Sequence, residues 1–104
     1  MQTDRMTKLR QMLDKSPTDP FLLFALGMEH KKLHQKDPAL DFFRRTIALD
    51  PGYAAAYHQA ALTCEDAGDI DQAKRLYKDG IAAARAKGDH HAAGEMEGAL
   101  SMIE

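Results

Sequence analysis

The chain has 104 residues, a formal net charge of −2 at pH 7 and one cysteine, Cys64. This length suits a single domain, the lone cysteine excludes an intramolecular disulfide, and no apolar run reaches the roughly 18 residues of a membrane span. Acidic residues accompany the basic ones along the chain, which argues against the basic surface that nucleic-acid binding requires. The polar N-terminus has no apolar segment typical of a secretion signal, so we expect a cytoplasmic protein.

Apolar residues recur at helical spacing throughout the chain, and no segment shows the alternation of a β-strand. The first predicted helix covers residues 3–15, with Asp4 in its first turn as the helix dipole prefers. The second covers residues 20–33, and it begins at Pro20 behind Asp19, an N-cap candidate. This second helix is apolar on two adjacent faces, so it must be covered on both or offer one as an interface.

Four further helices are predicted in the rest of the chain. We expect them over residues 37–49, 53–67, 71–87 and 89–103. Aspartates at three of these starts are N-cap candidates, namely Asp37, Asp71 and Asp89. Inside the second helix, Gly27 costs roughly 1 kcal/mol relative to alanine, which close approach by a neighbouring helix would offset.

A 34-residue period organises these helices. Within residues 20–53 the marks are Leu23-x2-Leu26-Gly27-x2-His30, then Ala39-x3-Phe43, and finally Pro51. Four of the apolar positions recur 34 residues later, as Tyr57, Ala73, Tyr77 and Ile81. This spacing resembles the tetratricopeptide repeat, a pair of antiparallel helices.

The resemblance covers nearly the whole chain and implies an all-α fold of helix-turn-helix repeats stacked as a short right-handed solenoid. It divides a single domain, residues 1–104, into a half repeat at 3–17, full repeats at 20–53 and 54–87, and a closing helix at 89–103. Members of the family are scaffolds without catalytic chemistry that bind peptides or partner proteins in a concave groove. The resemblance therefore implies a protein or peptide partner, no cofactor and no enzymatic activity.

Some family members hold a chaperone's C-terminus in a clamp of Lys, Arg and Asn side chains at groove positions. The matching positions in this sequence are Phe21, Phe24, Ala25 and Met28 in the first repeat and Ala55, His58, Gln59 and Leu62 in the second. None of them is Lys, Arg or Asn, so we expect no clamp of that kind.

Candidate chemical residues are few. His30 and His34 lie four apart on one helix, but they lack a third metal ligand and the glutamate order of a metallopeptidase motif. Cys64 falls on a core stripe, where a thiol acts as a small hydrophobe. His90-His91 is interpreted as a pair of exposed turn residues, and Asp69 with Asp71 in a turn is weak evidence for calcium, which needs six or more oxygen ligands. A metal protein or enzyme built on His30, His34 or Cys64 remains a minor alternative.

One apolar stripe is left over after the core is assigned, and we predict that it lines the concave groove with a polar rim. The predicted groove residues are Phe21, Phe24, Met28, Lys31, Ala55, His58, Leu62 and Met96. Phe24, Met28 and Leu62 should be unusually exposed in an isolated monomer or covered by another chain, because large exposed apolar patches mark interaction sites. Ordinary core packing of this stripe is the competing interpretation. The main hypothesis is a scaffold that binds an apolar peptide or helix, and the alternative is self-association through the same groove.

Overall fold

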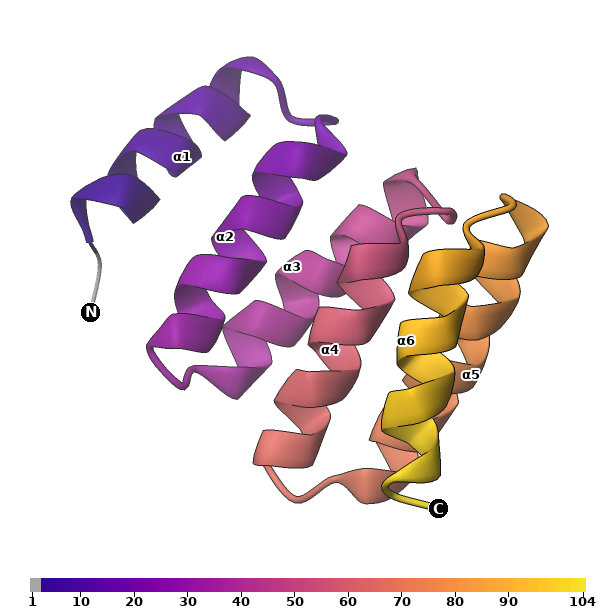
Figure 1. Cartoon of the computed structure of the whole chain (residues 1–104). Helices are drawn as coiled ribbons and strands as arrows, with labels where there is room; N and C mark the ends of the chain where they lie inside the picture. The colour runs from indigo at the N-terminus through magenta and orange to yellow at the C-terminus, as the bar shows by residue number, and fades with distance from the viewer. Residues whose placement is uncertain (1–2) are drawn as a thin grey trace.

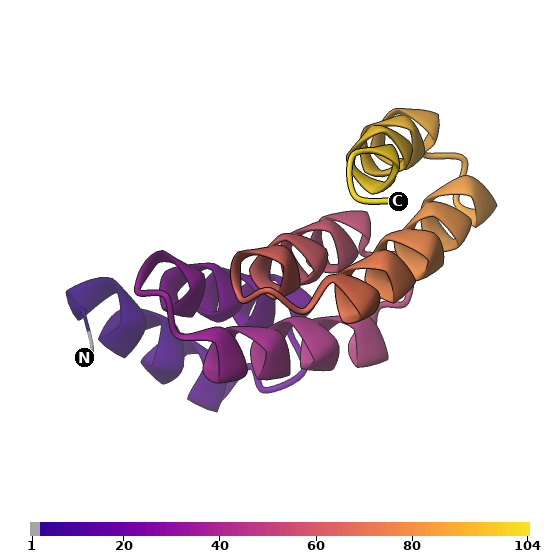
Figure 2. The same cartoon turned by 90° about the horizontal axis from the view of Figure 1, so that it is seen from below.

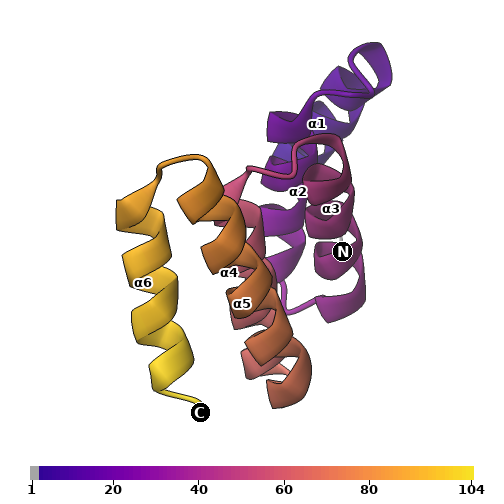
Figure 3. The same ribbon diagram turned by 90° about the vertical axis from the view of Figure 1, so that its right-hand side faces the viewer.

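The computed structural model describes residues 3–104, and within them the chain forms helices joined by short turns (Figure 1). The helices are α1 (Asp4–Lys15), α2 (Pro20–Lys32), α3 (Lys36–Leu49), α4 (Ala54–Asp66), α5 (Ile70–Ala86) and α6 (His90–Ser101). Successive helices pack side by side, from α1 at one end of an array of 38 × 29 × 18 Å to α6 at the other (Figure 3). The predicted all-α solenoid is therefore confirmed. No helix in the described residues is both long enough and apolar enough to cross a membrane.

The array bends toward one side (Figure 2). On that side α2 contacts α4 and α4 contacts α6, whereas within residues 3–104 no close backbone contact joins α1 to α3 or α3 to α5. Helices that approach one another more closely in one layer than in the other produce curvature toward the closer layer. The surface formed by α2, α4 and α6 is called the inner face below.

Two of the four expected aspartate caps are present, and two are not. Asp19 and Asp89 cap α2 and α6 by accepting hydrogen bonds from backbone N–H groups of the first turn. The predicted cap of α5 at Asp71 is wrong, because Asp69 occupies that position and accepts from the backbone N–H of Gln72. The φ of +83° at Gly68 turns the chain out of α4 just before Asp69, so α5 begins earlier than the sequence pattern indicated.

The predicted cap of α3 at Asp37 is also wrong. His34 adopts a φ of +58° after α2, and α3 begins at Lys36 with Gln35 as its N-cap residue. The Gln35 side chain makes no capping bond, because its Oε1 lies 2.7 Å from Nδ1 of His30 and accepts from it. Asp37 instead lies in the first turn of α3, where its charge suits the positive end of the helix dipole.

Small residues bring paired helices into close contact, as predicted for Gly27. A Cβ atom at Gly27 would lie 2.5 Å from Cε1 of Phe43, which is fully buried. Gly80 is equally crowded, since a Cβ there would lie 2.6 Å from Cβ of Tyr57. These two contacts let α3 approach α2 and α5 approach α4 closely enough to bury the apolar faces of both repeats.

Candidate partner-binding face

Four of the predicted groove residues lie on one stripe of α2. Phe21 is 58% exposed, whereas Phe24 and Met28 are half-buried. The Phe24 ring centroid lies 5.1 Å from that of Tyr53, at the start of α4, and 5.7 Å from that of Phe43. Leu62 on α4 is half-buried as well. The expected unusual exposure of Phe24, Met28 and Leu62 is therefore not found, because the next repeat covers part of this stripe.

The prediction that Met96 continues the stripe is wrong. Met96 is fully buried, and a Cβ at Gly80 would lie 2.6 Å from its sulfur. It belongs to the core cluster that contains Tyr57 and Tyr77. The rotation of α6 about its axis decides this, because the side of α6 that carries Ala93 and Met96 packs against the second repeat.

The inner face is hollowed between α4 and α6. The hollow has a volume of about 440 Å³ and is lined by Ala54, Ala55, His58, Gln59, Asp89, His91, Ala92, Glu95 and Met96. On α6 the lining includes the buried Met96 and the polar side chains of His91 and Glu95, whose Nε2 and Oε1 atoms lie 3.3 Å apart. Sequence reasoning missed His91 on this face because it interpreted that residue as part of an exposed turn, and it assigned no role to Glu95.

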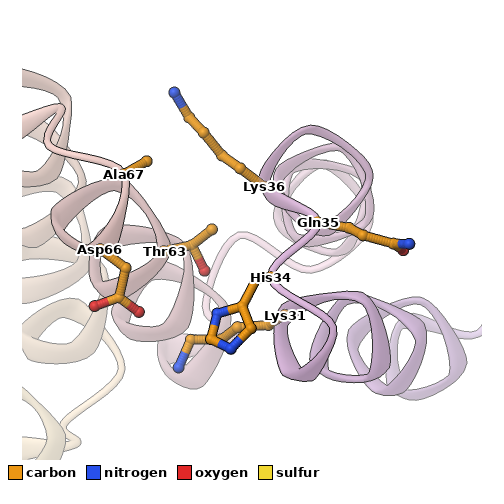
Figure 4. A pocket seen from close by; sticks show the side chains of 7 residues that line it. All are labelled: Lys31, His34, Gln35, Lys36, Thr63, Asp66 and Ala67. Carbon is orange, nitrogen blue, oxygen red and sulfur yellow. The ribbon is translucent and has the colours of Figure 1, made fainter.

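A second, smaller pocket lies between the α2–α3 turn and the C-terminal end of α4 (Figure 4). Its volume is about 110 Å³. This pocket, called the turn pocket below, is lined by Lys31, His34, Gln35, Lys36, Thr63, Asp66 and Ala67. Only Lys31 among them was predicted as a groove residue. The others come from a turn and a helix end, so no helical stripe in the sequence links them.

The candidate chemical residues serve packing or lie at the surface. His30 is buried, its Nε2 lies 3.2 Å from Nη2 of Arg10, and its Nδ1 is bonded to Gln35. His34 is exposed. Cys64 is buried, and burial followed by the nearby Asp69 charge raises the pKa of its thiol, which opposes formation of a reactive thiolate. Within residues 3–104 no three His, Cys, Asp or Glu side chains gather as a metal site would require.

Stacked antiparallel helix pairs with an open inner face define the α-solenoid class of repeat proteins. A family model described as tetratricopeptide repeat matches residues 54–87. A TPR repeat-containing protein of Pseudomonas aeruginosa is 30% identical over 88 residues, which span 85% of this chain and 84% of that protein. The chain belongs to the tetratricopeptide repeat family.

Solved structures resemble this chain over most of its length. A protein from Bordetella parapertussis is 29% identical with a TM-score of 0.83, covering 99% of this chain and 89% of that one. A tetratricopeptide repeat domain protein from Salinibacter ruber is 32% identical with a TM-score of 0.79, and the match covers 85% of this chain and 89% of that one. PcrH, solved in complex with the chaperone binding region of PopD, is 19% identical with a TM-score of 0.88. The match covers 96% of this chain and 76% of that one.

Proposed function

We propose that this protein is a non-catalytic scaffold that holds an apolar segment or helix of a partner protein on its inner face. The observation that carries the proposal is the stripe of α2, where exposed Phe21 continues into half-buried Phe24 and Met28, and α4 adds the half-buried Leu62. Polar groups of the two pockets border this apolar band. An apolar centre surrounded by a polar, solvent-accessible rim is typical of protein-binding surfaces.

The fold itself supports a bound segment. PcrH has the same fold and was solved in complex with the chaperone binding region of PopD. The inner face is curved, and a concave surface contacts a rod-like segment along its length. Two copies of a surface that curves inward touch mainly at their rims, which counts against the alternative of self-association through this face. Measurement of the mass in solution tests that alternative, and a concentration-dependent dimer abolished by Phe21→Asp would favour it over the scaffold.

Substitution at Phe21 tests the scaffold with little risk to the fold. Phe21→Asp places a charge in the band at a side chain that is 58% exposed, so folding should be unaffected while partner capture is lost. Phe24→Asp with Met28→Asp is a harsher test, because Phe24 packs on Tyr53 and Phe43 and the double variant should lose stability as well.

The matched control is Met12→Asp, which removes an apolar side chain that is 52% exposed on α1, away from the inner face. Affinity capture from the native cell should recover one set of proteins with the natural chain and with Met12→Asp, and lose that set with Phe21→Asp. Equal recovery by all three chains, with equal melting temperatures, would place partner binding on another surface.

A further inference from the structure

The hollow between α4 and α6 differs from the apolar stripe of α2 because hydrogen-bond acceptors line it. Asp89 and Glu95 contribute carboxylates to the lining, and none of the described residues that line the hollow is a lysine or an arginine. We propose that this hollow binds one arginine side chain of the partner segment that lies on the inner face. The proposal rests on the proposed function and adds a chemical requirement for the partner.

Charge is distributed unevenly between the two layers of helices. Neither α4 nor α6 contains a lysine or an arginine, whereas α1 and α5 of the other layer contain four each. The lysines of the third inner helix, α2, lie in its last turn, and neither of them lines the hollow. The acidic residues of α4 and α6 are Glu65, Asp66, Glu95 and Glu97. Because complementary charge steers and orients binding partners, this half of the inner face favours a basic segment.

Both carboxylates of the hollow remain able to bind a cation. Asp89 caps α6 through Oδ1, which accepts from the backbone N–H of Ala92 at 3.1 Å, and its charge offsets the positive end of the helix dipole. Glu95 is 57% exposed, and no lysine or arginine of the described chain lies within 4.0 Å of it. Its neighbour His91 is charged only when protonated. An exposed pair of this kind is weak, so an arginine can take the place of the histidine.

An unpaired acceptor on the opposite wall favours a guest with several donors. Gln59 of α4 lines the hollow, and its Oε1 is buried without a hydrogen-bond partner in the described residues. Rotation of this side chain brings the oxygen to a donor that enters beside it. A guanidinium carries five N–H donors in one plane, so a single arginine can donate to Gln59 and to Glu95 together. The hollow, at about 440 Å³, is large enough for this side chain.

The test is a titration of the whole protein followed by the amide resonances of Ala55 and Ala92, at low ionic strength matched with sodium chloride. The probes are N-acetyl-arginine N-methylamide and the corresponding citrulline compound, whose side chain has nearly the same shape but no charge. We expect saturable shifts with both probes and about tenfold tighter binding of the arginine compound, as charge-assisted hydrogen bonds predict. Magnesium chloride is the third probe.

Two kinds of variant should remove this preference for arginine. Asp89→Asn with Glu95→Gln neutralises the hollow and keeps the cap of α6, because asparagine is a good N-cap residue. The control Asp71→Asn with Glu97→Gln removes the same charge outside the hollow and should keep the preference. Ala55→Lys, at an exposed position of the lining, should remove it by placing an ammonium group in the hollow. Melting temperatures check that each variant is folded.

Four results would overturn the proposal. They are equal binding of the arginine and citrulline compounds, an unchanged preference in the folded hollow variants, the same loss in the control, or displacement of the arginine compound by magnesium. Phe21→Asp separates this proposal from the scaffold function, because Phe21 does not line the hollow and the variant should keep the arginine preference. A folded Phe21→Asp chain that keeps both this preference and its protein partners would refute the scaffold surface alone.

Discussion

At the scale of single residues, the glycines inside the helices are of two kinds. Gly27 and Gly80 lie where another side chain occupies the space that a Cβ would need. Gly94 and Gly98 lie inside α6 with no atom within 4 Å of that position. The first kind allows close packing of helices, whereas the second has only the backbone-entropy cost of glycine in a helix.

This difference predicts opposite effects of one substitution. Gly98→Ala should raise the free energy of unfolding by about 0.5–1 kcal/mol, because alanine has the higher helix propensity and meets no neighbour. Gly27→Ala should lower it by about 1 kcal/mol or more, since its Cβ would collide with the buried ring of Phe43. Urea denaturation of both variants measures the two signs, and a stabilised Gly27→Ala would show that Phe43 can move aside.

Tyr77 predicts a pH dependence of stability. Burial raises the pKa of Tyr77 above its ordinary value of 10.0, and its hydrogen bond to Glu65 raises the pKa further. The folded state thus favours the neutral phenol, so the stabilisation is complete below pH 10 and is lost as pH rises above 10 toward the higher pKa of the folded state. Unfolding curves between pH 8 and 11 should show this decline for the natural chain and a smaller decline for Tyr77→Phe. Parallel declines in the two chains would remove Tyr77 as the source.

At the scale of elements, α1 is attached through a polar contact as well as an apolar one. In the described residues close backbone contacts join α1 only to α2, and α1 buries just Met6 and Leu9. Arg10 reaches across to His30, and its guanidinium carbon lies 5.8 Å from the centroid of the Phe42 ring. Such a terminal half repeat should open more readily than the rest of the stack.

Arg10→Ala should therefore loosen α1 selectively. The variant leaves Nε2 of His30 without its donor and removes the cation from the face of Phe42, at an expected cost of about 1–3 kcal/mol in α1 docking. Hydrogen exchange should accelerate for the amides of α1 and remain slow in α4 and α5. The control is Lys8→Ala, an exposed position on the same helix. Faster exchange throughout the chain would show that α1 and the repeats unfold as one unit.

At the scale of the whole molecule, one core cluster joins the two repeats. It contains Ala39, Leu40 and Phe43 of α3, Ala60 and Cys64 of α4, and Ala73 of α5. Both Ala39 and Ala73 are fully buried. In a repeat array the stability depends on such contacts between neighbours, so this cluster should decide whether the repeats unfold together.

A tryptophan in this cluster should weaken the whole stack. Ala39→Trp and Ala73→Trp should each lower the free energy of unfolding by about 1–3 kcal/mol through overpacking, and the melting temperature should fall with it. Ala48→Trp, at an exposed position of α3, is the control and should leave the melting temperature nearly unchanged. Unchanged melting in both buried variants would contradict the repeat register that places these two alanines in the core.

The sequence alone determined the elements of this protein and their repetition. Helical spacing, the caps at Asp19 and Asp89 and the 34-residue period are signals within one stretch of sequence. They can be recognised without knowing which helices pack together. They were sufficient for the helix positions, for the solenoid, and for the close contact at Gly27.

Only the tertiary structure decided which side chains reach the inner face. Met96 faces the core because the rotation of α6 is set by its packing on Tyr57 and Gly80, far away in the chain. Gln35 does not cap α3 with its side chain because that side chain is bonded to His30. The turn pocket likewise exists only because the end of α4 lies beside the α2–α3 turn. Such placements depend on contacts between distant segments, whose energies a pattern along one chain does not contain.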